Sequence, residues 1–212
     1  MIHTYGDLSD MHLDILSEIG NIGAGNAATS LAILLGERVD ITVPSVRLLE
    51  YKDVISSTLG DPEELGVAIL INYTGDIRGV VLFLLGYEDA RGITDILTDG
   101  MEDNTDNYGG SGLSEMKLSA IKEIGNILGS SYLGSLSTLT NLHVNISVPY
   151  MAIDMVGAIM GPPMLEFSID NKNIMLIEES FMTSRGSLKS HVILFADIPS
   201  LNRIMKELGL FI

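Results

Sequence analysis

Apolar and polar residues recur with two different periods along this chain, and the periods predict helices and strands in turn. From about Ser9 or Asp10 to Leu35, apolar side chains return every three or four positions, which is typical of an amphipathic helix that Gly36 ends. Residues 38–43 alternate and are β-branched, which indicates a strand. The next elements predicted are a short helix over 54–62, a hairpin of 66–73 and 77–85 around Thr74-Gly75-Asp76, and a short helix over 89–97.

The same order of elements returns in the second half of the chain. Residues 14–44 align without gaps with residues 119–149, a shift of 105, and 12 of the 31 pairs are identical. The similarity continues more weakly between 81–97 and 192–208. We therefore expect one pseudo-symmetric domain over 1–212, with repeat one at 9–98, an acidic, Gly-rich linker at 99–112 and repeat two at 113–212.

A single repeat would leave one sheet edge and one apolar sheet face uncovered. Two copies can pair their strands and bury both sets of helices on the joint sheet. The expected fold class is therefore α/β (α+β), with the two repeats forming one continuous central β-sheet around a pseudo-two-fold axis. The linker is expected to be solvated. Its acids could hold calcium, but it lacks the spacing of an EF-hand loop.

Composition limits the classes of partner and the cellular location that the sequence predicts. The net charge is −16 and only 12 Lys and Arg residues are present, scattered along the chain, so nucleic acid and anionic membranes are poor partners. No apolar run approaches the roughly 18–20 residues that cross a bilayer, so we expect no membrane insertion. The N-terminal stretch is polar without a signal-peptide pattern, and cysteine is absent, so the expected location is cytoplasmic.

One face of the first helix carries the polar residues that the repeat preserves. On a wheel of about 100° per residue, one band about 60° wide holds Asp14, Glu18, Asn21 and Gly25, and Ala28 and Ala32 extend it. The opposite side is apolar and is expected to face the core, with Leu13, Leu16, Ala27, Leu31 and Leu34. In the second repeat the places of the polar band are taken by Ser119, Glu123, Asn126 and Ser130.

This face could be an ordinary solvated helix surface, which is the usual meaning of single Glu and Asn residues. Two observations favour a functional surface instead. Asn is a poor residue inside a helix, and Gly20, Gly23 and Gly25 each cost roughly 1 kcal/mol relative to Ala there. Small side chains would also let the surface of another protein approach the helix closely.

Other chemistries find little support in the sequence. The glycines of segment 20–26 follow the order Gly-x-x-Gly-x-Gly, which does not match the Gly-x-Gly-x-x-Gly of dinucleotide sites. The four histidines lack metal-ligand spacing, and neither a cysteine nor a nucleophile elbow is present. Covalent catalysis and a metal site are therefore not expected. The methionines are expected to fill the core, including Met151, Met155, Met160 and Met164.

An acid and an amide can still act together without a nucleophile or a metal. A carboxylate can pair with a lysine of a partner and fix the docking register. A neutral amide can both donate to and accept from one water molecule. Placing water in this way suffices when the substrate is already activated, as an aspartyl phosphate is.

The spacing of these residues resembles a known family motif. Asp or Ser, three residues, Glu, two residues, Asn, twenty-two residues and Pro characterise the CheC/CheX/FliY family of chemotaxis phosphatases, and the sequence fits this motif twice. The resemblance covers the whole chain and is strongest to the CheC branch. The matching residues are Asp14, Glu18, Asn21 and Pro44 in the first copy and Ser119, Glu123, Asn126 and Pro149 in the second.

The resemblance implies both a fold and an activity. The fold would be a central sheet with two long antiparallel helices on one face, each carrying one site. The activity would be hydrolysis of the aspartyl phosphate on the response regulator CheY, without a covalent intermediate. Glu18 and Glu123 would contact a lysine of the regulator, and Asn21 and Asn126 would orient the attacking water. The protein would need no cofactor of its own, since Mg²⁺ would come with CheY.

The same resemblance implies a second partner, the receptor deamidase CheD. It would dock on a short helix expected over 153–159, at Asp154, Met155, Gly157, Ala158 and Ile159, although core packing accounts for this apolar helix equally well. A rival to the enzymatic interpretation also stays open. The chain could be a non-catalytic adaptor or scaffold that binds CheY or CheD without changing the lifetime of the phosphate.

Overall fold

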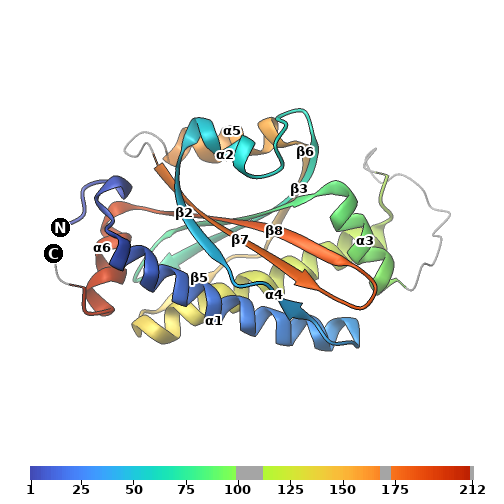
Figure 1. Cartoon of the computed structure of the whole chain (residues 1–212), viewed down its shortest axis with the longest axis horizontal. Helices are drawn as coiled ribbons and strands as arrows, with labels where there is room; N and C mark the ends of the chain where they lie inside the picture. Colours follow the sequence, from blue (N-terminus) through green and yellow to red (C-terminus); the bar gives the residue numbers. More distant parts are fainter. Residues whose placement is uncertain (99–111, 168–172, 211–212) are drawn as a thin grey trace.

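The computed structural model describes residues 1–98, 112–167 and 173–210, which form one mixed structure of helices and sheet (Figure 1). The linker expected at 99–112 lies outside these residues, apart from Gly112. In chain order the elements are the 3-10 helix η1 (Tyr5–Asp7), α1 (Asp10–Leu35), β1 (Asp40–Ile41), β2 (Ser45–Glu50), α2 (Tyr51–Ser57), β3 (Leu65–Gly75), β4 (Gly79–Gly86), α3 (Tyr87–Leu97), α4 (Glu115–Thr140), β5 (Val144–Ile146), β6 (Tyr150–Met155), α5 (Val156–Phe167), β7 (Asn173–Met182), β8 (Ser187–Ala196) and α6 (Ile198–Glu207).

The eight strands of the described residues belong to one antiparallel sheet. Its order is β1-β7-β8-β4-β3-β5, while β2 also pairs with β7 and β6 with β3. If β1 to β4 are exchanged with β5 to β8, taken in chain order, the result is the same strand order read from the other edge of the sheet. Each half of the chain therefore contributes strands to both ends of the sheet, and the sheet is continuous as the sequence predicts.

Helices cover both faces of this sheet. The long helices α1 and α4 lie side by side and run in opposite directions on one face, whereas α2 and α5 lie on the other (Figure 1). Two hydrophobic clusters fill the space between the layers. Neighbouring residues of a strand point to opposite faces, so β4 supplies both clusters, with Val81, Phe83 and Leu85 in the first and Val80, Leu82 and Leu84 in the second.

Local signals place the ends of the two long helices. At the start of α1 the backbone N–H of Ser9 donates to His12 Nδ1 at 2.9 Å, and Gly36 ends the helix in the left-handed conformation with a φ of 67°. Asn141, 105 residues after Gly36, ends α4 with a φ of 55°. Gly and Asn adopt this conformation most readily, so both helices stop at equivalent places. The predicted bounds of α1 are confirmed.

The turn of each hairpin holds the segment that follows a long helix. Beyond the end of α4, the backbone N–H of His143 donates to Asp76 Oδ2 of the β3–β4 turn at 2.8 Å, and this bond lowers the pKa of the Asp76 carboxyl. Beyond the end of α1, Arg185 Nε of the β7–β8 turn donates to Glu37 Oε1 at 3.0 Å. Ser184 also donates to Glu37 and is the main cause of its lowered pKa. Each long helix is thus anchored to the hairpin of the other half of the chain.

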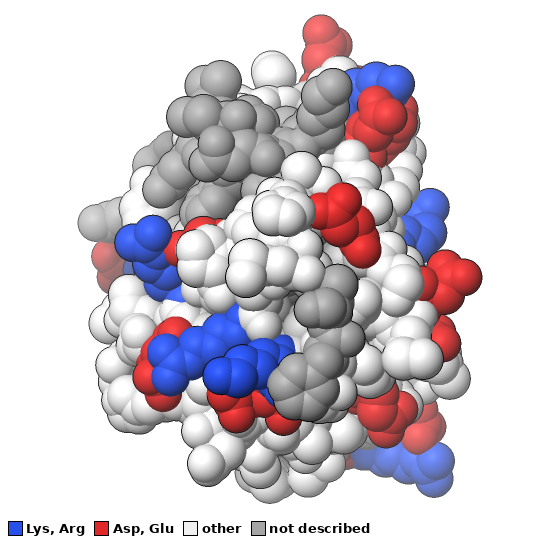
Figure 2. All heavy atoms as spheres, turned by 90° about the vertical axis from the view of Figure 1, so that its left-hand side faces the viewer, with Lys and Arg blue, Asp and Glu red and all other residues white. Residues whose placement is uncertain are grey.

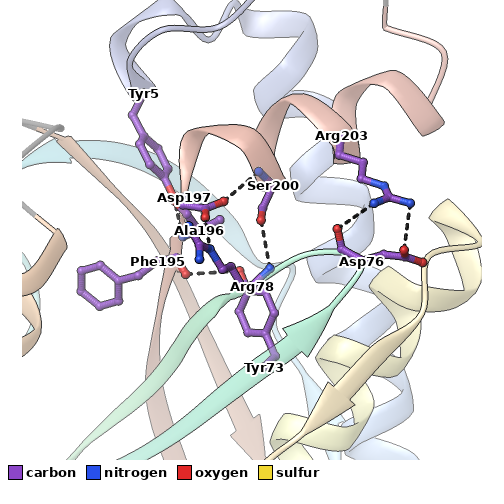
Figure 3. A network of polar contacts seen from close by, with 9 residues as sticks. All are labelled: Tyr5, Tyr73, Asp76, Arg78, Phe195, Ala196, Asp197, Ser200 and Arg203. Atoms are coloured by element: carbon purple, nitrogen blue, oxygen red, sulfur yellow. Dashed lines mark hydrogen bonds and ion pairs between the residues drawn. The ribbon is translucent and has the colours of Figure 1, made fainter.

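A polar network fixes α6 at one end of the sheet (Figure 3). The backbone N–H of Arg78 donates to Ser200 Oγ at 2.9 Å, and the Arg78 side chain pairs with Asp197, the N-cap of α6. Arg203 pairs with Asp76 at 2.8 Å. Seen from this end of the molecule, basic and acidic side chains lie next to one another (Figure 2). The charges of these two arginines are therefore matched by neighbouring carboxylates.

Three predicted elements have different bounds. The strand expected over 38–43 is confined to β1, and the unpredicted β2 follows it. The short helix expected over 54–62 is α2, which ends at Ser57. The helix expected over 153–159 starts only at Val156, because 153–155 belong to β6 and pair with β3. Pairing with a strand from a distant part of the chain outweighs the local helical pattern.

Two residues expected in the core are exposed instead. Leu34 is 36% exposed in the last turn of α1, and its counterpart Leu139 in α4 is 42% exposed, so both helices turn this position to solvent. Met155 is 52% exposed because it lies in β6 rather than in a packed helix. The other expected core residues with described side chains are buried (Leu16, Ala27, Leu31 and Met160) or half-buried (Leu13 and Met151).

Candidate active site

The two acid and amide pairs lie on the long helices and face outward. Glu18 and Asn21 are exposed on α1, and Glu123 and Asn126 are exposed on α4. Within each pair the amide follows the acid by three residues, almost one helical turn, so both side chains project from one face. In the described part of the chain, none of these four side chains has a hydrogen bond or ion pair with another residue. Their polar groups are therefore available to a partner or to water.

The other four positions of the motif differ in exposure. Asp14 and Ser119 are exposed, about one turn before each acid. Pro44 is buried between β1 and β2, and Pro149 is half-buried between β5 and β6. Proline has no N–H to donate and therefore interrupts a strand. The two prolines shape corners of the sheet that contact the long helices and do not belong to the exposed face.

The glycine between each acid and amide faces the sheet. A Cβ added at Gly20 would lie 3.6 Å from Ile177 Cδ1 of β7, which is an ordinary contact. A Cβ added at Gly125 would collide with Ile69 Cγ2 of β3. The helix that carries the second pair therefore lies closer to its strand, and its glycine cannot be replaced without a shift of Ile69.

Two further glycines of α1 have opposite surroundings. A Cβ at Gly23 would lie 3.0 Å from Tyr132 Cδ1 and 3.1 Å from Tyr132 Cα, so Gly23 lets α1 approach α4. A Cβ at Gly25 would meet nothing within 4 Å. The expectation that small residues open this face to a partner holds for Gly25 and in part for the half-buried Ala32, whereas Gly20 and Gly23 serve packing and Ala28 is buried.

A groove of about 480 Å³ opens between the two helices, next to Asn126. Its lining is rich in hydroxyl and amide groups and contains no charged side chain. Across it, Asn26 Nδ2 of α1 donates to Ser135 Oγ of α4 at 3.1 Å, which links the two helices. The lining residues are Ile22, Asn26, Ser30, Asn126, Ile127, Ser130, Ser131, Gly134, Ser135, Thr138 and Leu139.

A buried acid lies under the helix pair, and sequence reasoning missed it. The hydroxyl of Tyr132 in α4 donates to Glu179 Oε2 of β7, and the Tyr132 ring contacts Phe83 edge-on at 5.9 Å between centroids. Glu179 is only 2% exposed, and burial raises its pKa to about 7. The signal available in the sequence was its position, since Glu179 falls on the inward face of β7 between Ile177 and Phe181.

Within residues 1–98, 112–167 and 173–210, no group of three or more His, Asp or Glu side chains is placed to hold a metal ion. Nor does any helix in these ranges have the length and apolar character needed to cross a membrane. The groups that the site exposes are carboxylates, which can pair with a cation, and amides, which can both donate to and accept from water.

The residues suggested for CheD lie at the end of β6 and in α5, the helix on the face of the sheet opposite to α1 and α4 (Figure 1). Asp154 and Met155 are exposed at the end of β6, and Ala158 is exposed in α5. Gly157 is half-buried, and Ile159 is buried in the core cluster under α5. The predicted set therefore spans a strand and a helix, and four of its five members can be reached from solvent.

The fold and the doubled motif define one family of proteins. The sequence profile of the CheC-like family matches residues 11–47 and 116–151, which contain both acid and amide pairs. The chain is therefore similar to the CheC-like family in both of its repeats.

Relatives and solved structures agree with this similarity. The CheY-P phosphatase CheC of Bacillus subtilis is 29% identical over 207 residues, 97% of each chain. The crystal structure of FliY from Thermotoga maritima matches with a TM-score of 0.73 at 26% identity, over 96% of this chain and 98% of that one. A chain of the CheX-CheY-BeF3-Mg²⁺ complex from Borrelia burgdorferi matches with a TM-score of 0.50 at 18% identity, over 81% of this chain and 95% of that one. The expected fold class is confirmed.

Proposed function

We propose that this protein accelerates hydrolysis of the aspartyl phosphate on a CheY-type response regulator. The observation that carries the proposal is the pair of exposed Glu and Asn side chains on each long helix, at the spacing of the family motif and without partners among the described residues. The support from relatives is that the CheC of B. subtilis is named as a CheY-P phosphatase and resembles this chain over nearly its full length.

The carboxylates of Glu18 and Glu123 dock the regulator. A carboxylate on an exposed helix can form a charge-assisted bond with a lysine of the partner. Such a bond fixes the register of the two proteins, which matters because the net charge of −16 gives no general attraction to an anionic partner. The Glu side chains therefore contribute mainly to binding and orientation.

The amides of Asn21 and Asn126 place the attacking water. The amide carbonyl accepts from the water while the amide N–H₂ can donate to the water or to a phosphoryl oxygen. The water oxygen attacks phosphorus, the bond from phosphorus to the aspartyl oxygen breaks, and the products are inorganic phosphate and a free aspartate carboxylate. Holding the water in line can supply several kcal/mol of the barrier. Mg²⁺ would be held by the regulator, and no covalent intermediate on this chain is required.

An adaptor that binds CheD is the second candidate. Met155 is exposed, and Leu65, its neighbour across the β3–β6 pair, is 42% exposed. This apolar pair lies at one end of the β3–β6 ladder, next to Asp154 in the chain. A partner such as CheD could dock on these exposed residues.

The test measures the lifetime of the phosphate on a CheY-type regulator by monitoring the release of inorganic phosphate. Sub-stoichiometric amounts of this protein should shorten that lifetime, with each molecule acting repeatedly. If the protein binds the regulator but leaves the lifetime unchanged, the adaptor interpretation replaces the enzymatic one.

A further inference from the structure

The groove between α1 and α4 is built from equivalent positions of the two motif segments. The shift of 105 residues that relates Asn21 to Asn126 also relates residues on its two walls. Asn126 lies on one rim, and Asn21 holds the equivalent position on α1. Of the four acid and amide side chains, Asn126 lines the groove, and the middle of the groove is built from paired positions of the two helices. It consists of Ile22 with Ile127, Asn26 with Ser131, and Ser30 with Ser135.

The two pairs are also close together. Gly23 packs against Tyr132 and Asn26 bonds to Ser135, so in these antiparallel helices Asn126 lies roughly level with the turn that follows Ser30. With a rise of about 1.5 Å per residue and axes about 8–10 Å apart, Asn21 and Asn126 are separated by roughly 15–20 Å.

A folded partner is wider than this separation. A domain of about 100 residues has a radius of gyration of about 13 Å, which corresponds to a diameter of about 30 Å or more. Two such domains cannot be centred roughly 15–20 Å apart on one helix pair without overlapping. A partner docked at Glu123 and Asn126 would also cover Ile22 and Ser30 of α1, which line the same groove, and Ile22 directly follows Asn21.

We infer that both acid and amide pairs share one docking groove, so that each molecule holds one phosphorylated regulator at a time, at either pair. The inference rests on the proposed function, because it names the regulator as the occupant of the groove. The second motif then raises the chance of a productive encounter and does not double the number of bound partners. Beside the Glu carboxylates, the groove offers the partner hydroxyl and amide groups together with the apolar side chains of Ile22, Ile127 and Leu139.

Stoichiometry tests the inference directly. A CheY-type regulator loaded with beryllofluoride, a stand-in for the phosphoryl group, is added in excess and the complex is weighed by native mass spectrometry or sedimentation. One regulator per chain is expected for the unmodified protein. The same is expected for both single-pair variants, Glu18→Ala with Asn21→Ala and Glu123→Ala with Asn126→Ala. Two regulators per chain would overturn the inference. Binding of the regulator by only one of the two variants would also overturn the inference. The single regulator on the unmodified protein would then be explained by one inactive pair and not by a shared groove.

A variant in the groove gives an independent check. In the background Glu18→Ala with Asn21→Ala, Ser30→Arg should weaken binding at the second pair about tenfold or more, because an α1 residue would then obstruct a partner docked on α4. Ser56→Arg, an equally large change on α2 at the opposite face, is the matched control and should have no effect. Unchanged binding by Ser30→Arg would contradict a shared groove. If the proposed function is wrong, neither the unmodified protein nor any variant shortens the lifetime of the phosphate, and this result is distinct from the outcomes of the binding experiments.

Discussion

Tyr132 of α4 donates its hydroxyl hydrogen to the carboxylate of Glu179 on β7, beneath the point where α1 meets α4 at Gly23. The other oxygen of Glu179 and the hydroxyl of Ser190, its cross-strand neighbour, have no hydrogen-bond partner among the described residues. A buried acid with half of its bonding capacity unused is costly when charged. The packing of the site helices is therefore linked to the protonation of one carboxyl group.

The first prediction concerns the pH dependence of stability. Burial raises the pKa of Glu179 from 4.5 to about 7, so its contribution to stability is fully present below about pH 4.5 and is lost as the pH rises through about 7. Glu179→Gln should therefore be more stable than the unmodified protein at pH 8, by up to about 3 kcal/mol, and equally stable near pH 4.5. Denaturant unfolding at both pH values measures the difference.

His191 does not disturb this comparison. Burial lowers its pKa to about 4, and its contribution to stability is lost as the pH falls from about 6.5 through 4. Because His191 is present in both proteins, its effect cancels in the difference. Parallel stability profiles for the two proteins between pH 4.5 and 8 would show that Glu179 is not the titrating group.

The second prediction uses two glycines that lie one residue apart on either side of Ala24. Gly25→Ala should stabilise the protein by up to about 1 kcal/mol, because the site is open and Ala is the better helix former. Gly23→Ala should destabilise it by about 1–3 kcal/mol, because the added carbon meets the backbone of Tyr132, which cannot rotate away. Thermal unfolding distinguishes them, with a shift of about 2–4 °C for each kcal/mol. Stabilisation by both changes would disprove the close helix contact.

The third prediction concerns ionic strength. With a net charge of −16, the protein repels an anionic phosphorylated regulator at long range, and salt screens this repulsion. The rate of phosphate release at low regulator concentration should therefore rise between about 10 mM and 150 mM salt, over which the Debye length falls from about 30 Å to 8 Å. The rate at saturating regulator concentration is the control and should change little. A flat or falling profile at low concentration would refute electrostatic limitation of the encounter.

The sequence was sufficient for features that depend on local signals. Ser9 and Gly36 mark the ends of α1, and the outward position of Glu18 and Asn21 follows from the helical period. The continuous sheet followed from the repeat, because each copy alone would leave an edge unpaired. Features that depend on distant partners could not be predicted in this way.

Three examples show what the local pattern lacks. The strand β6 forms because it pairs with β3, which lies about 85 residues earlier. Gly23 and Gly25 look alike in the sequence, and only the position of Tyr132 shows that one is needed for packing and the other is not. In the sequence Glu179 is one of two acids at the end of an apolar run, and its burial depends on Tyr132, which lies 47 residues away. In each case a contact between remote segments decides the outcome.

The central claim is that Asn21 and Asn126 supply the water-placing groups while the two Glu residues dock the regulator. The most direct measurement compares the unmodified protein with the double variant Asn21→Ala and Asn126→Ala, whose exposed helix positions tolerate Ala without loss of stability. We expect the variant to bind the beryllofluoride-loaded regulator as tightly as before, while the phosphate on the regulator decays at its unassisted rate. If the double variant still shortens the phosphate lifetime as the unmodified protein does, the amides do not perform the reaction and the account is contradicted.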